Sequence, residues 1–581
     1  MDKVIINKYL NGEIINKEEV KEKHKDPLKS CVLKLKRVSN SKIEFLFIKE
    51  FEPKIGSISK DWSGKQFEFI VRIDSIVETT GPVIMKLYDG SGFIEARTTQ
   101  SLIQNLKIGD IVKVRLFIRF KGKKREAELM SYKLLGEDEL DKARELIKRR
   151  EEEKAKPETT EFLIRSDCYS KLKQEFVKAA SIIRNAIFEA RPIIIRHHAD
   201  CDGYSGAIAL ERAILPLIAQ EHGSESATFW YYKRAPSRKP FYEYSDATKD
   251  LSFNLDTTAR KKPPLIIIVD NGSTREDLLG IKKVKIYDAK VIVIDHHLPI
   301  IEDGRVLTNE FVDAHINPHL VGYDGNITAG MLSFELARFI NKDFSSEKKN
   351  LLLPALSGVG DKSNCAEQEE YLRIAAENGF SNDYLKKLAE CVDFEAYYLG
   401  FVESRSIIDD LLGGNVEKQE KLIELLRGDI EYRKKEQIKI IKETMRTEEI
   451  KGATNGIRIV MLDLENISLR SEFPPPGKIT GLAYWMLLNN INKPNGLNNT
   501  NEPMKKQETK LLVLGIASDY VTIRTNIEGF NTNKIIDYLQ ERIGFGFISG
   551  GGHENAGTVK FISGVKEGVI NGVKEFLKEN F

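Results

Sequence analysis

The chain of 581 residues is poor in cysteine and has no long apolar run. Its five cysteines are far apart and form no CxxC pair. This spacing argues against a disulfide framework and a zinc ribbon, and it fits a reducing compartment. No window reaches the ~18 uninterrupted apolar residues of a membrane span, and charges interrupt residues 1–20, where a signal peptide needs an apolar segment. We therefore expect a cytoplasmic protein with no membrane partner.

The chain also carries almost no net charge, because its 89 lysines and arginines are nearly balanced by 87 aspartates and glutamates. A nucleic acid would therefore have to bind a local basic surface. The length exceeds what one hydrophobic core supports, and about 100–200 residues per domain predicts three or four domains.

Strand patterns dominate the chain up to residue 136. Residues 1–60 alternate lysines with short apolar runs, which predicts a β-rich segment of no identified fold. In residues 66–136, QFEFIVRID and KVRLFIRFK alternate apolar and polar side chains, as half-buried strands do. The order of these strands predicts a small closed barrel that resembles an OB-fold.

One face of KVRLFIRFK carries cations that flank an aromatic ring: Arg115, Phe117, Arg119 and Lys121. Such a face suits a single strand of nucleic acid, because a base stacks on the ring while the cations neutralise phosphates. The alternative interpretation is an ordinary solvated strand rich in lysine.

Residues 137–190 have helical patterns and are predicted to be a connector. Between 190 and 365, the apolar runs PIIIR, LIIIV and VIVI alternate with helical segments. Continuous apolar runs are typical of a parallel sheet that is covered on both faces. The sequence therefore predicts a multidomain α/β protein with a parallel-sheet domain over 190–365.

Acids and histidines gather where these runs end. His198, Asp200 and Asp202 follow PIIIR, Asp270 follows LIIIV, the triplet Asp295, His296 and His297 follows VIVI, and Asp361 follows LLLPALSG. Ligands of an open parallel sheet bind beyond the carboxyl ends of its strands, so we expect these side chains to line one crevice at four strand ends. Any one of them alone would be interpreted as a helix cap or a core histidine.

Carboxylates that converge on one crevice repel one another unless cations hold them together. Five carboxylates with one or two imidazoles are too many ligands, and too rich in oxygen, for one tetrahedral zinc ion. They suit two six-coordinate ions that share a bridging carboxylate. We expect manganese first and magnesium second.

These residues resemble the four motifs of the DHH phosphoesterases: HADCDG, VDNG, DHH and GVGDKSN. INPH at 316–319 and ITAGMLSFELA at 327–337 are similar to a segment of the RecJ branch. Near the carboxyl terminus, GGGHENAG resembles the DHHA1 substrate-binding domain. With an OB-like domain before it, the whole chain looks most like an archaeal RecJ-like exonuclease.

The resemblance implies a ligand for each ion. One ion would be held by His198, Asp200 and Asp270. The other would be held by Asp202, Asp270, His296 and Asp361, so that Asp270 bridges the two. Asp295 and His297 would support the ligands from outside. Two ions about 3.5–4 Å apart would activate a water and neutralise the charge of a phosphodiester under attack.

Beyond the predicted catalytic domain, residues 366–450 are helical and charged. We predict that they form a bridge to the next domain. The alternative interpretation is a solvated spacer. Residues 451–581 predict a smaller α/β domain, which the resemblance identifies as DHHA1. Its phosphate-binding residues would be Gly550, Gly551, Gly552, His553 and Arg524, because glycines let a backbone approach a phosphate and arginine can bind one in bidentate fashion. Residues 492–508 predict a mobile surface loop.

The function predicted from the sequence is a metal-dependent exonuclease that hydrolyses single-stranded DNA or RNA in repair, recombination or replication. Two alternatives remain open. The first is a DHH enzyme acting on very short oligonucleotides or on linear or cyclic dinucleotides, and the second is a scaffold in a replication complex. Replication or repair proteins are possible partners in each case.

Overall fold

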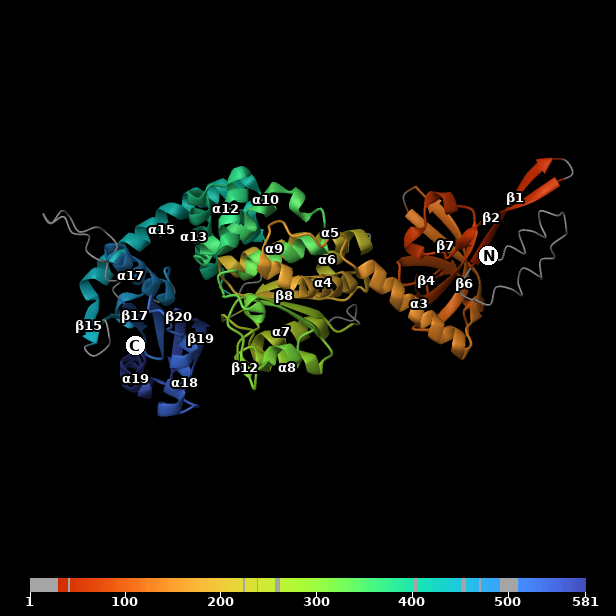
Figure 1. Ribbon diagram of the computed structural model, residues 1–581. Coiled ribbons are helices and arrows are strands. Elements are labelled where there is room, and N and C mark those ends of the chain that lie inside the picture. The colour runs from red at the N-terminus through yellow and green to blue at the C-terminus, as the bar shows by residue number, and fades with distance from the viewer. Residues whose placement is uncertain are drawn as a thin grey trace. The chain divides into compact units, whose positions relative to one another are not determined.

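The computed structural model describes residues 30–39, 42–122, 124–222, 225–237, 239–255, 262–400, 406–450, 456–469, 472–491 and 510–581. The chain divides into two compact units, Met1–Lys156 and Pro157–Phe581 (Figure 1). The loop predicted at 492–508 lies outside the described residues. Among the described helices, none combines the length and apolarity needed to cross a membrane.

A closed five-stranded barrel forms most of the first unit, in the order β3-β4-β5-β7-β6. Its strands are β3 (Gln66–Val77), β4 (Val83–Tyr88), β5 (Phe93–Thr98), β6 (Ile111–Lys121) and β7 (Lys124–Leu134). The apolar positions of the alternating segments fill the barrel, as Val71 and Leu116 show with side chains fully buried. The predicted barrel is confirmed. Before it, β1 (Ser30–Ser39) and β2 (Lys42–Phe51) pair as an antiparallel hairpin.

Helix α3 (Glu137–Ala155) is fastened to this barrel by the buried side chain of Arg150. The Arg150 guanidinium donates to Asp89 Oδ2 (2.8 Å), to Glu52 Oε1 (2.9 Å) and to the Pro53 carbonyl (3.2 Å). Arg150 is 3% exposed and the Asp89 side chain is fully buried, so removing Arg150 would leave the Asp89 carboxylate buried without its cation.

The parallel sheet of the second unit has the strand order β14-β11-β10-β8-β9, and every neighbouring pair is parallel. The strands are β8 (Ile193–His197), β9 (Tyr232–Pro236), β10 (Leu265–Val269), β11 (Lys290–Ile294) and β14 (Ala314–Ile316). The predicted sheet is confirmed. Strand β9 directly follows the short helix α6 (Ala227–Tyr231).

Helices cover both faces of this sheet, as the continuous apolar runs required. One face carries α4 (Asp167–Phe188), α5 (Cys201–His222), α9 (Ala329–Ile340) and α11 (Leu353–Gly360), with α10 (Lys348–Leu351) before α11. The opposite face carries α7 (Tyr244–Leu255) and α8 (Leu278–Ile286). A small hairpin joins β12 (Ile301–Glu302) to β13 (Arg305–Val306).

Two segments expected to connect domains belong instead to the core of the sheet domain. Tyr169 and Phe176 of α4 are fully buried there, so the second half of 137–190 is not a connector. Helices α12 (Ala366–Glu377) and α13 (Asn382–Leu399) also enter this core, through Tyr371 and Leu388. The apolar stripes of these helices pack against this core, whereas a solvated spacer would leave them exposed to water. Only the part that follows, α14 (Ser406–Asp409) and α15 (Val416–Thr444), leads to the next sheet.

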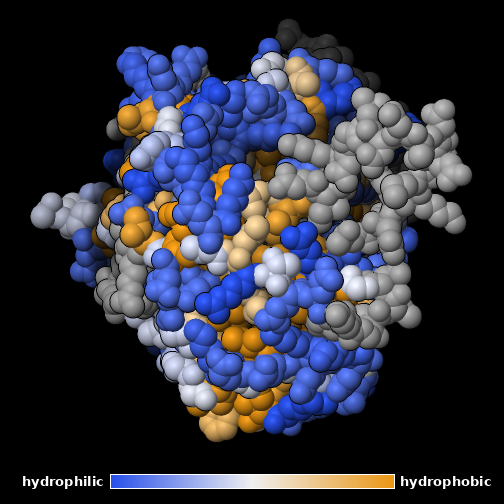
Figure 2. All heavy atoms as spheres, turned by 90° about the vertical axis from the view of Figure 1, so that its left-hand side faces the viewer, coloured by the Kyte–Doolittle hydropathy of each residue, from blue (hydrophilic) through white to orange (hydrophobic). Residues whose placement is uncertain are grey.

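A six-stranded sheet forms the carboxyl-terminal domain, in the order β15-β16-β17-β18-β20-β19. Its strands are β15 (Arg446–Ile450), β16 (Ile457–Asp463), β17 (Leu511–Ile516), β18 (Tyr520–Thr525), β19 (Ile548–His553) and β20 (Ala556–Phe561). Helices α16 (Leu464–Ile467) and α17 (Pro476–Ile491) cover one face, and α18 (Thr532–Ile543) and α19 (Lys566–Asn580) cover the other. Seen from the side of this domain, hydrophilic side chains cover much of the surface and apolar ones form separate patches (Figure 2).

Replacing Arg150 with methionine tests the contact between α3 and the barrel. We expect Arg150→Met to lower the free energy of opening of this contact by about 3–5 kcal/mol, because the Asp89 carboxylate would stay buried without its cation. Hydrogen exchange of the β4 and α3 amides would measure this opening. Arg149→Met is the matched control, because Arg149 on the same helix is 60% exposed. Equal protection in both variants would contradict the assignment.

Candidate metal centre

Asp270 lies at the centre of the candidate site. It follows β10, and its backbone amide donates to the Ile294 carbonyl of β11 (2.9 Å). Its φ of 57° is in the left-handed region, which costs about 1–3 kcal/mol for a residue other than glycine. Its two carboxylate oxygens face different partners: Oδ2 is 3.2 Å from His198 Nδ1, and Oδ1 is 3.2 Å from His296 Nε2.

The first group of potential ligands surrounds Oδ2 of Asp270. His198 Nδ1 is also 2.9 Å from Asp200 Oδ2, and ligand atoms of all three residues lie within 4.8 Å of one another. The other oxygen of Asp200 accepts a hydrogen bond from the Gly203 amide (3.0 Å). Asp200 therefore accepts a hydrogen bond in the first turn of α5, as a helix cap does, while its other oxygen faces the site.

The second group consists of Asp202, His296 and Asp361. His296 Nε2 is 3.6 Å from Asp202 Oδ2 and 3.3 Å from Asp361 Oδ2. The other ring nitrogen of His296 is 2.7 Å from the Gly325 carbonyl, which can only accept a hydrogen bond. Nδ1 therefore carries a proton, and Nε2 faces the carboxylates. Burial alone would lower the pKa of this ring, but the carboxylates raise it well above its ordinary value. A divalent cation that binds Nε2 would replace the second proton of the imidazolium.

Asp202 is held in place by the amino terminus of α9. Its two oxygens accept hydrogen bonds from the amides of Ala329 (3.0 Å) and Gly330 (2.7 Å), and the Ser357 hydroxyl donates to the same carboxylate. A Cβ on Gly330 would lie 2.8 Å from Asp202 Oδ1 and 2.6 Å from the Ser357 Cβ. Glycine at this position therefore lets the helix approach the carboxylate closely.

Asp295 holds neighbouring residues of the site in place through hydrogen bonds. Its Oδ1 accepts hydrogen bonds from the His296 amide (2.8 Å) and from His297 Nδ1 (2.7 Å), and its Oδ2 accepts one from the Ser273 amide (3.1 Å). His297 Nδ1 is 3.8 Å from Asp270 Oδ1, so His297 borders the centre while its proton points to Asp295. Asp295 thereby orients both histidines of the triplet.

Asp361 reaches the centre from a different kind of element than expected. It follows helix α11, so three strands and one helix supply the cluster, not four strands. Cys201, which lies between two of the aspartates, turns away, because its Sγ contacts the Leu356 carbonyl at 3.7 Å. Burial raises the pKa of this thiol well above the ordinary value, which keeps it protonated.

Burial and mutual repulsion dominate the electrostatics of the centre. Burial, and then the charge of Asp270, raises the pKa of Asp202 to about 7. Burial, and then the charge of Asp202, raises the pKa of Asp361 well above its usual range. Burial alone would lower the pKa of His198, but the carboxylates of Asp200 and Asp270 raise it well above the ordinary value. The side chains thus retain protons that partly compensate their excess negative charge.

The donor set fits divalent cations that could replace those protons. Ligand atoms converge in two groups, the two oxygens of Asp270 face one group each, and the donors are carboxylates and imidazoles. Such a mixed set suits octahedral ions such as Mn²⁺ or Mg²⁺ better than tetrahedral zinc.

Comparison with known proteins agrees with this geometry. The model of the DHH family, N-terminal domain, matches residues 192–358, which include every cluster residue except Asp361. An uncharacterized protein of Methanocaldococcus jannaschii is 36% identical over 531 residues, which are 87% of this chain and 67% of that protein. The chain belongs to the DHH family. Members of this family are phosphoesterases.

Solved structures of the DHH family include similar chains. A structure described as the DHH domain of a member of the s1p family of ribosomal proteins is 36% identical, with a TM-score of 0.68. The match covers 76% of this chain and 99% of that one. RecJ of Thermus thermophilus, solved in complex with Mn²⁺, is 14% identical with a TM-score of 0.46, over 70% of this chain and 55% of that one.

A group of cations lies beside the carboxylates of this DHH protein, and the sequence did not reveal it. Lys362 directly follows Asp361, and its Nζ lies 4.3 Å from the ring centroid of Trp485 on α17. Lys478 pairs with Asp393 of α13, whose other oxygen accepts a hydrogen bond from the Cys201 amide (3.0 Å). The charge of Lys478 also lowers the pKa of Asp200, behind the larger effects of burial and His198. Lys478 therefore lies near the first ligand group.

Arg524 joins this cation group, as the effect on Lys362 shows. Burial, and then the charges of Arg524 and Lys478, lowers the pKa of Lys362 to about 8. Arg524 donates to the Ile523 carbonyl (2.7 Å). The sequence analysis gave Lys362 no role although it lies within GVGDKSN, and no motif pointed to Lys478 or Trp485, because segments far apart in the chain bring the three together.

The three glycines predicted to bind phosphate form part of a strand rather than a loop. Gly550, Gly551 and Gly552 lie in β19 at the edge of the sheet and pair with Val559, Thr558 and Gly557 of β20. With φ of 157° and 145°, Gly550 and Gly552 leave no room for a Cβ, which would come within 2.5 Å of the β20 carbonyls of Thr558 and Ala556. The side chain of His553 lies outside the described residues.

The proposed nucleic-acid face of the barrel is only partly free. Arg115 donates to Glu68 Oε1 at 2.7 Å, and Arg119 lies 3.3 Å from Glu128 Oε2. The Arg119 guanidinium is 5.0 Å from the ring centroid of Phe117, so the aromatic ring and its cation do lie together. The side chain of Lys121 lies outside the described residues. These acids reduce the basic character that the sequence pattern of β6 suggested.

Asp361→Asn tests the metal site without relying on activity. The raised pKa of Asp361 means that its ionised form destabilises the folded chain at neutral pH, so the melting temperature without metal should stay the same or rise. The increase in melting temperature on adding Mn²⁺ should shrink, because one ligand is lost. Calorimetry in EDTA and in Mn²⁺ would measure both. A full Mn²⁺ increment in the variant would exclude Asp361 as a ligand.

Proposed function

We propose that the chain is a two-metal phosphodiesterase that removes nucleotides from single-stranded DNA or RNA as an exonuclease. The observation that carries this proposal is the carboxylate of Asp270, whose two oxygens face separate ligand groups. Two cations that share such a carboxylate are typical of enzymes that displace an oxygen at phosphorus in line.

In this proposal His198, Asp200 and Asp270 hold one cation, and Asp202, Asp270, His296 and Asp361 hold the other. When bound, the cations supply an activated water and neutralise charge on the phosphate under attack. Mn²⁺ is the first choice, because two imidazoles join the carboxylates, and Mg²⁺ is the second.

The protein side chains would bind and orient the phosphodiester. Lys362, Lys478 and Arg524 contribute three positive charges beside the ligand groups and can contact the oxygens of the phosphates that flank the reacting bond. Asp295 keeps the ring of His297 in one orientation, and the Gly325 carbonyl does the same for the ring of His296. Cys201 cannot serve as the nucleophile, because its thiol stays protonated and contacts the Leu356 carbonyl.

Nucleic acid is the substrate class that this arrangement favours, and the barrel of the first unit could bind a longer strand through Phe117 and Arg119. A role in repair, recombination or replication follows from that substrate class. Edge strand β19 presents a backbone without side chains at three consecutive glycines, which suits a further contact to phosphate, with His553 as an additional donor.

The direct test is a time course with single-stranded DNA, single-stranded RNA, a duplex and a dinucleotide, each end-labelled, in Mn²⁺, Mg²⁺ or EDTA. We expect stepwise, metal-dependent shortening of the single strands, and a loss of at least about a thousand-fold in rate for Asp270→Asn. Asp303→Asn is the matched control, because Asp303 also has a left-handed backbone (φ 49°) but lies in an exposed turn.

Three results would contradict the exonuclease. Cleavage of the dinucleotide alone would favour a small-substrate enzyme. Binding of Mn²⁺ without cleavage of any substrate would favour a scaffold. Turnover by Asp270→Asn close to the native rate would refute the shared carboxylate.

The cation group has its own test. Lys362→Met and Lys478→Met should raise KM for single-stranded substrate more than they change kcat, and should reduce the salt dependence of binding by about one charge each. Lys439→Met on α15 is the control, because Lys439 is 57% exposed and pairs only with Glu436 of the same helix among the described ion pairs. An unchanged salt dependence in all three variants would remove these lysines from the substrate path.

A further inference from the structure

The turn that enters α7 presents an aromatic ring from a rigid base. Tyr242 is fully buried, its amide donates to Asp277 Oδ1 (2.6 Å), and its hydroxyl donates to Asp250 Oδ2 (3.1 Å). The residue before it, Phe241, is only half-buried, and a β-bridge between Phe241 and Lys239 closes the turn. The anchor of Tyr242 therefore fixes the position from which Phe241 projects.

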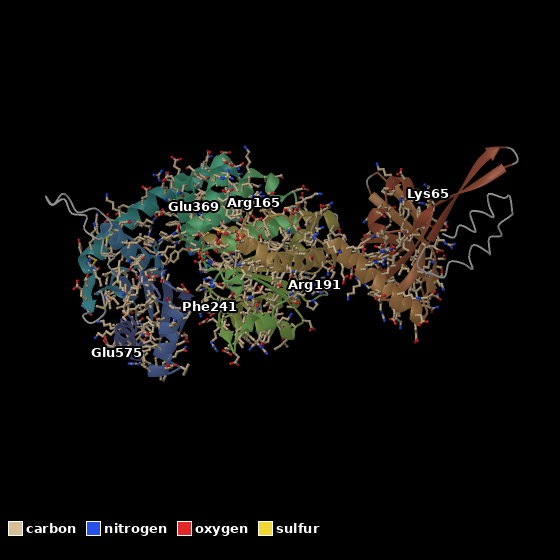
Figure 3. The ribbon with its side chains drawn as sticks, in the orientation of Figure 1. Lys65, Arg165, Arg191, Phe241, Glu369 and Glu575 are labelled. Atoms are coloured by element: carbon tan, nitrogen blue, oxygen red, sulfur yellow. The ribbon has the colours of Figure 1, made fainter. Side chains whose placement is uncertain are left out.

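Phe241 projects toward the carboxyl-terminal sheet. Figure 3 labels Phe241 on the side of its domain that faces this sheet. Lys560 Nζ of β20 lies 4.8 Å from the centroid of the Phe241 ring, and Lys239 Nζ lies 5.7 Å from it. A Cβ on Gly551 of β19 would be 4.0 Å from Glu276 Oε2, so the glycine strand also lies beside the segment that follows Asp270. Two domains thus meet around this ring, and two ammonium groups flank it.

The position of Phe241 differs from that of the cation group. Phe241 lies at the start of α7, which covers one face of the parallel sheet, whereas Lys362 follows α11, which covers the other face. The candidate metal ligands lie at the carboxyl ends of the strands, between those two faces. A polynucleotide that contacts Lys362 and Trp485 on one side of the metal centre can therefore continue to Phe241 on the other.

We infer that Phe241, with Lys239 and Lys560, is a base-stacking subsite that binds a nucleotide of the single strand on the α7 side of the metal centre. This inference rests on the proposed function and specifies its substrate as a chain long enough to occupy both sides. A ring with two ammonium groups close to it combines the two interactions that hold single strands without regard to sequence: stacking of a base and neutralisation of phosphates.

The two ammonium groups beside the ring interact with nearby acids, and a polyanionic ligand could displace those contacts. Lys239 forms an ion pair with Glu243, and the charge of Glu276 acts on Lys560. The Lys239 side chain is 47% exposed, and a single ion pair near the surface contributes little to stability, so its ammonium group can turn from Glu243 and the ring to a phosphate at small cost.

Binding without turnover tests this subsite. The full chain is titrated in EDTA with fluorescent single strands of about 12 nucleotides, each with one abasic position, and anisotropy gives the affinity. We expect one position at which the missing base weakens binding to the native chain. Phe241→Leu should bind the intact strand about five- to a hundred-fold more weakly, and should show no further loss at that position. Phe241→Trp should retain the native pattern.

Phe311→Leu is the matched control. Phe311 also has an ammonium group over its ring, Lys282 at 4.7 Å, but it precedes β14, at the edge of the sheet opposite the metal ligands. Native affinity of Phe241→Leu, the same loss at every abasic position in both chains, or no binding of single strands at all would overturn the subsite. Because no metal is present, a chain that binds in the expected pattern but does not cleave in Mn²⁺ would contradict the exonuclease alone.

Discussion

Repulsion among buried carboxylates at the carboxyl edge of the parallel sheet is the constraint on which the rest of the catalytic domain depends. Asp200, Asp202, Asp270 and Asp361 share one centre with two imidazoles, and burial with mutual repulsion raises the pKa of Asp202 and Asp361. Groups next to each carboxylate partly compensate its charge. The amino termini of α5 and α9 donate backbone hydrogen bonds, and the imidazoles of His198 and His296 lie between the acids. The remaining charge is what makes the centre a site for divalent cations.

The second requirement is positive charge for the substrate, and it comes from elements remote in sequence. Lys362 follows a metal ligand, whereas Lys478 and Arg524 belong to the carboxyl-terminal domain. Asp393 links the two, because it pairs with Lys478 and accepts a hydrogen bond from the amide of Cys201 between two ligands. A single aspartate on α13 thus connects Lys478, which would contact a phosphate, to the backbone beside the acids that would bind metal.

Membership of the DHH family and the parallel sheet followed from local patterns. Continuous runs such as LIIIV form buried strands because every side chain in them is apolar, and the acid directly after each run must then lie at the sheet edge. Prediction failed where burial depends on a distant partner. The helices α4, α12 and α13 carry many charges, so their buried stripes were taken for connectors. The sequence also did not reveal that glycines 550–552 form a strand, because their pairing with β20 is not visible in their composition.

The sequence by itself determined which chemistry this chain can hold: the kinds of ligand, their order and their attachment to strand ends, because all of these depend on residues within a few positions of one another. Only the tertiary structure decided how the ligands divide into two groups around Asp270, that Asp361 arrives from a helix, and that Lys362, Lys478 and Trp485 border the centre. These relations join segments separated by tens to hundreds of residues around the centre, whereas Phe241 lies beside Lys560 of the carboxyl-terminal sheet and not in the ligand cluster. All of them exist only after the two sheets have packed their helices against each other.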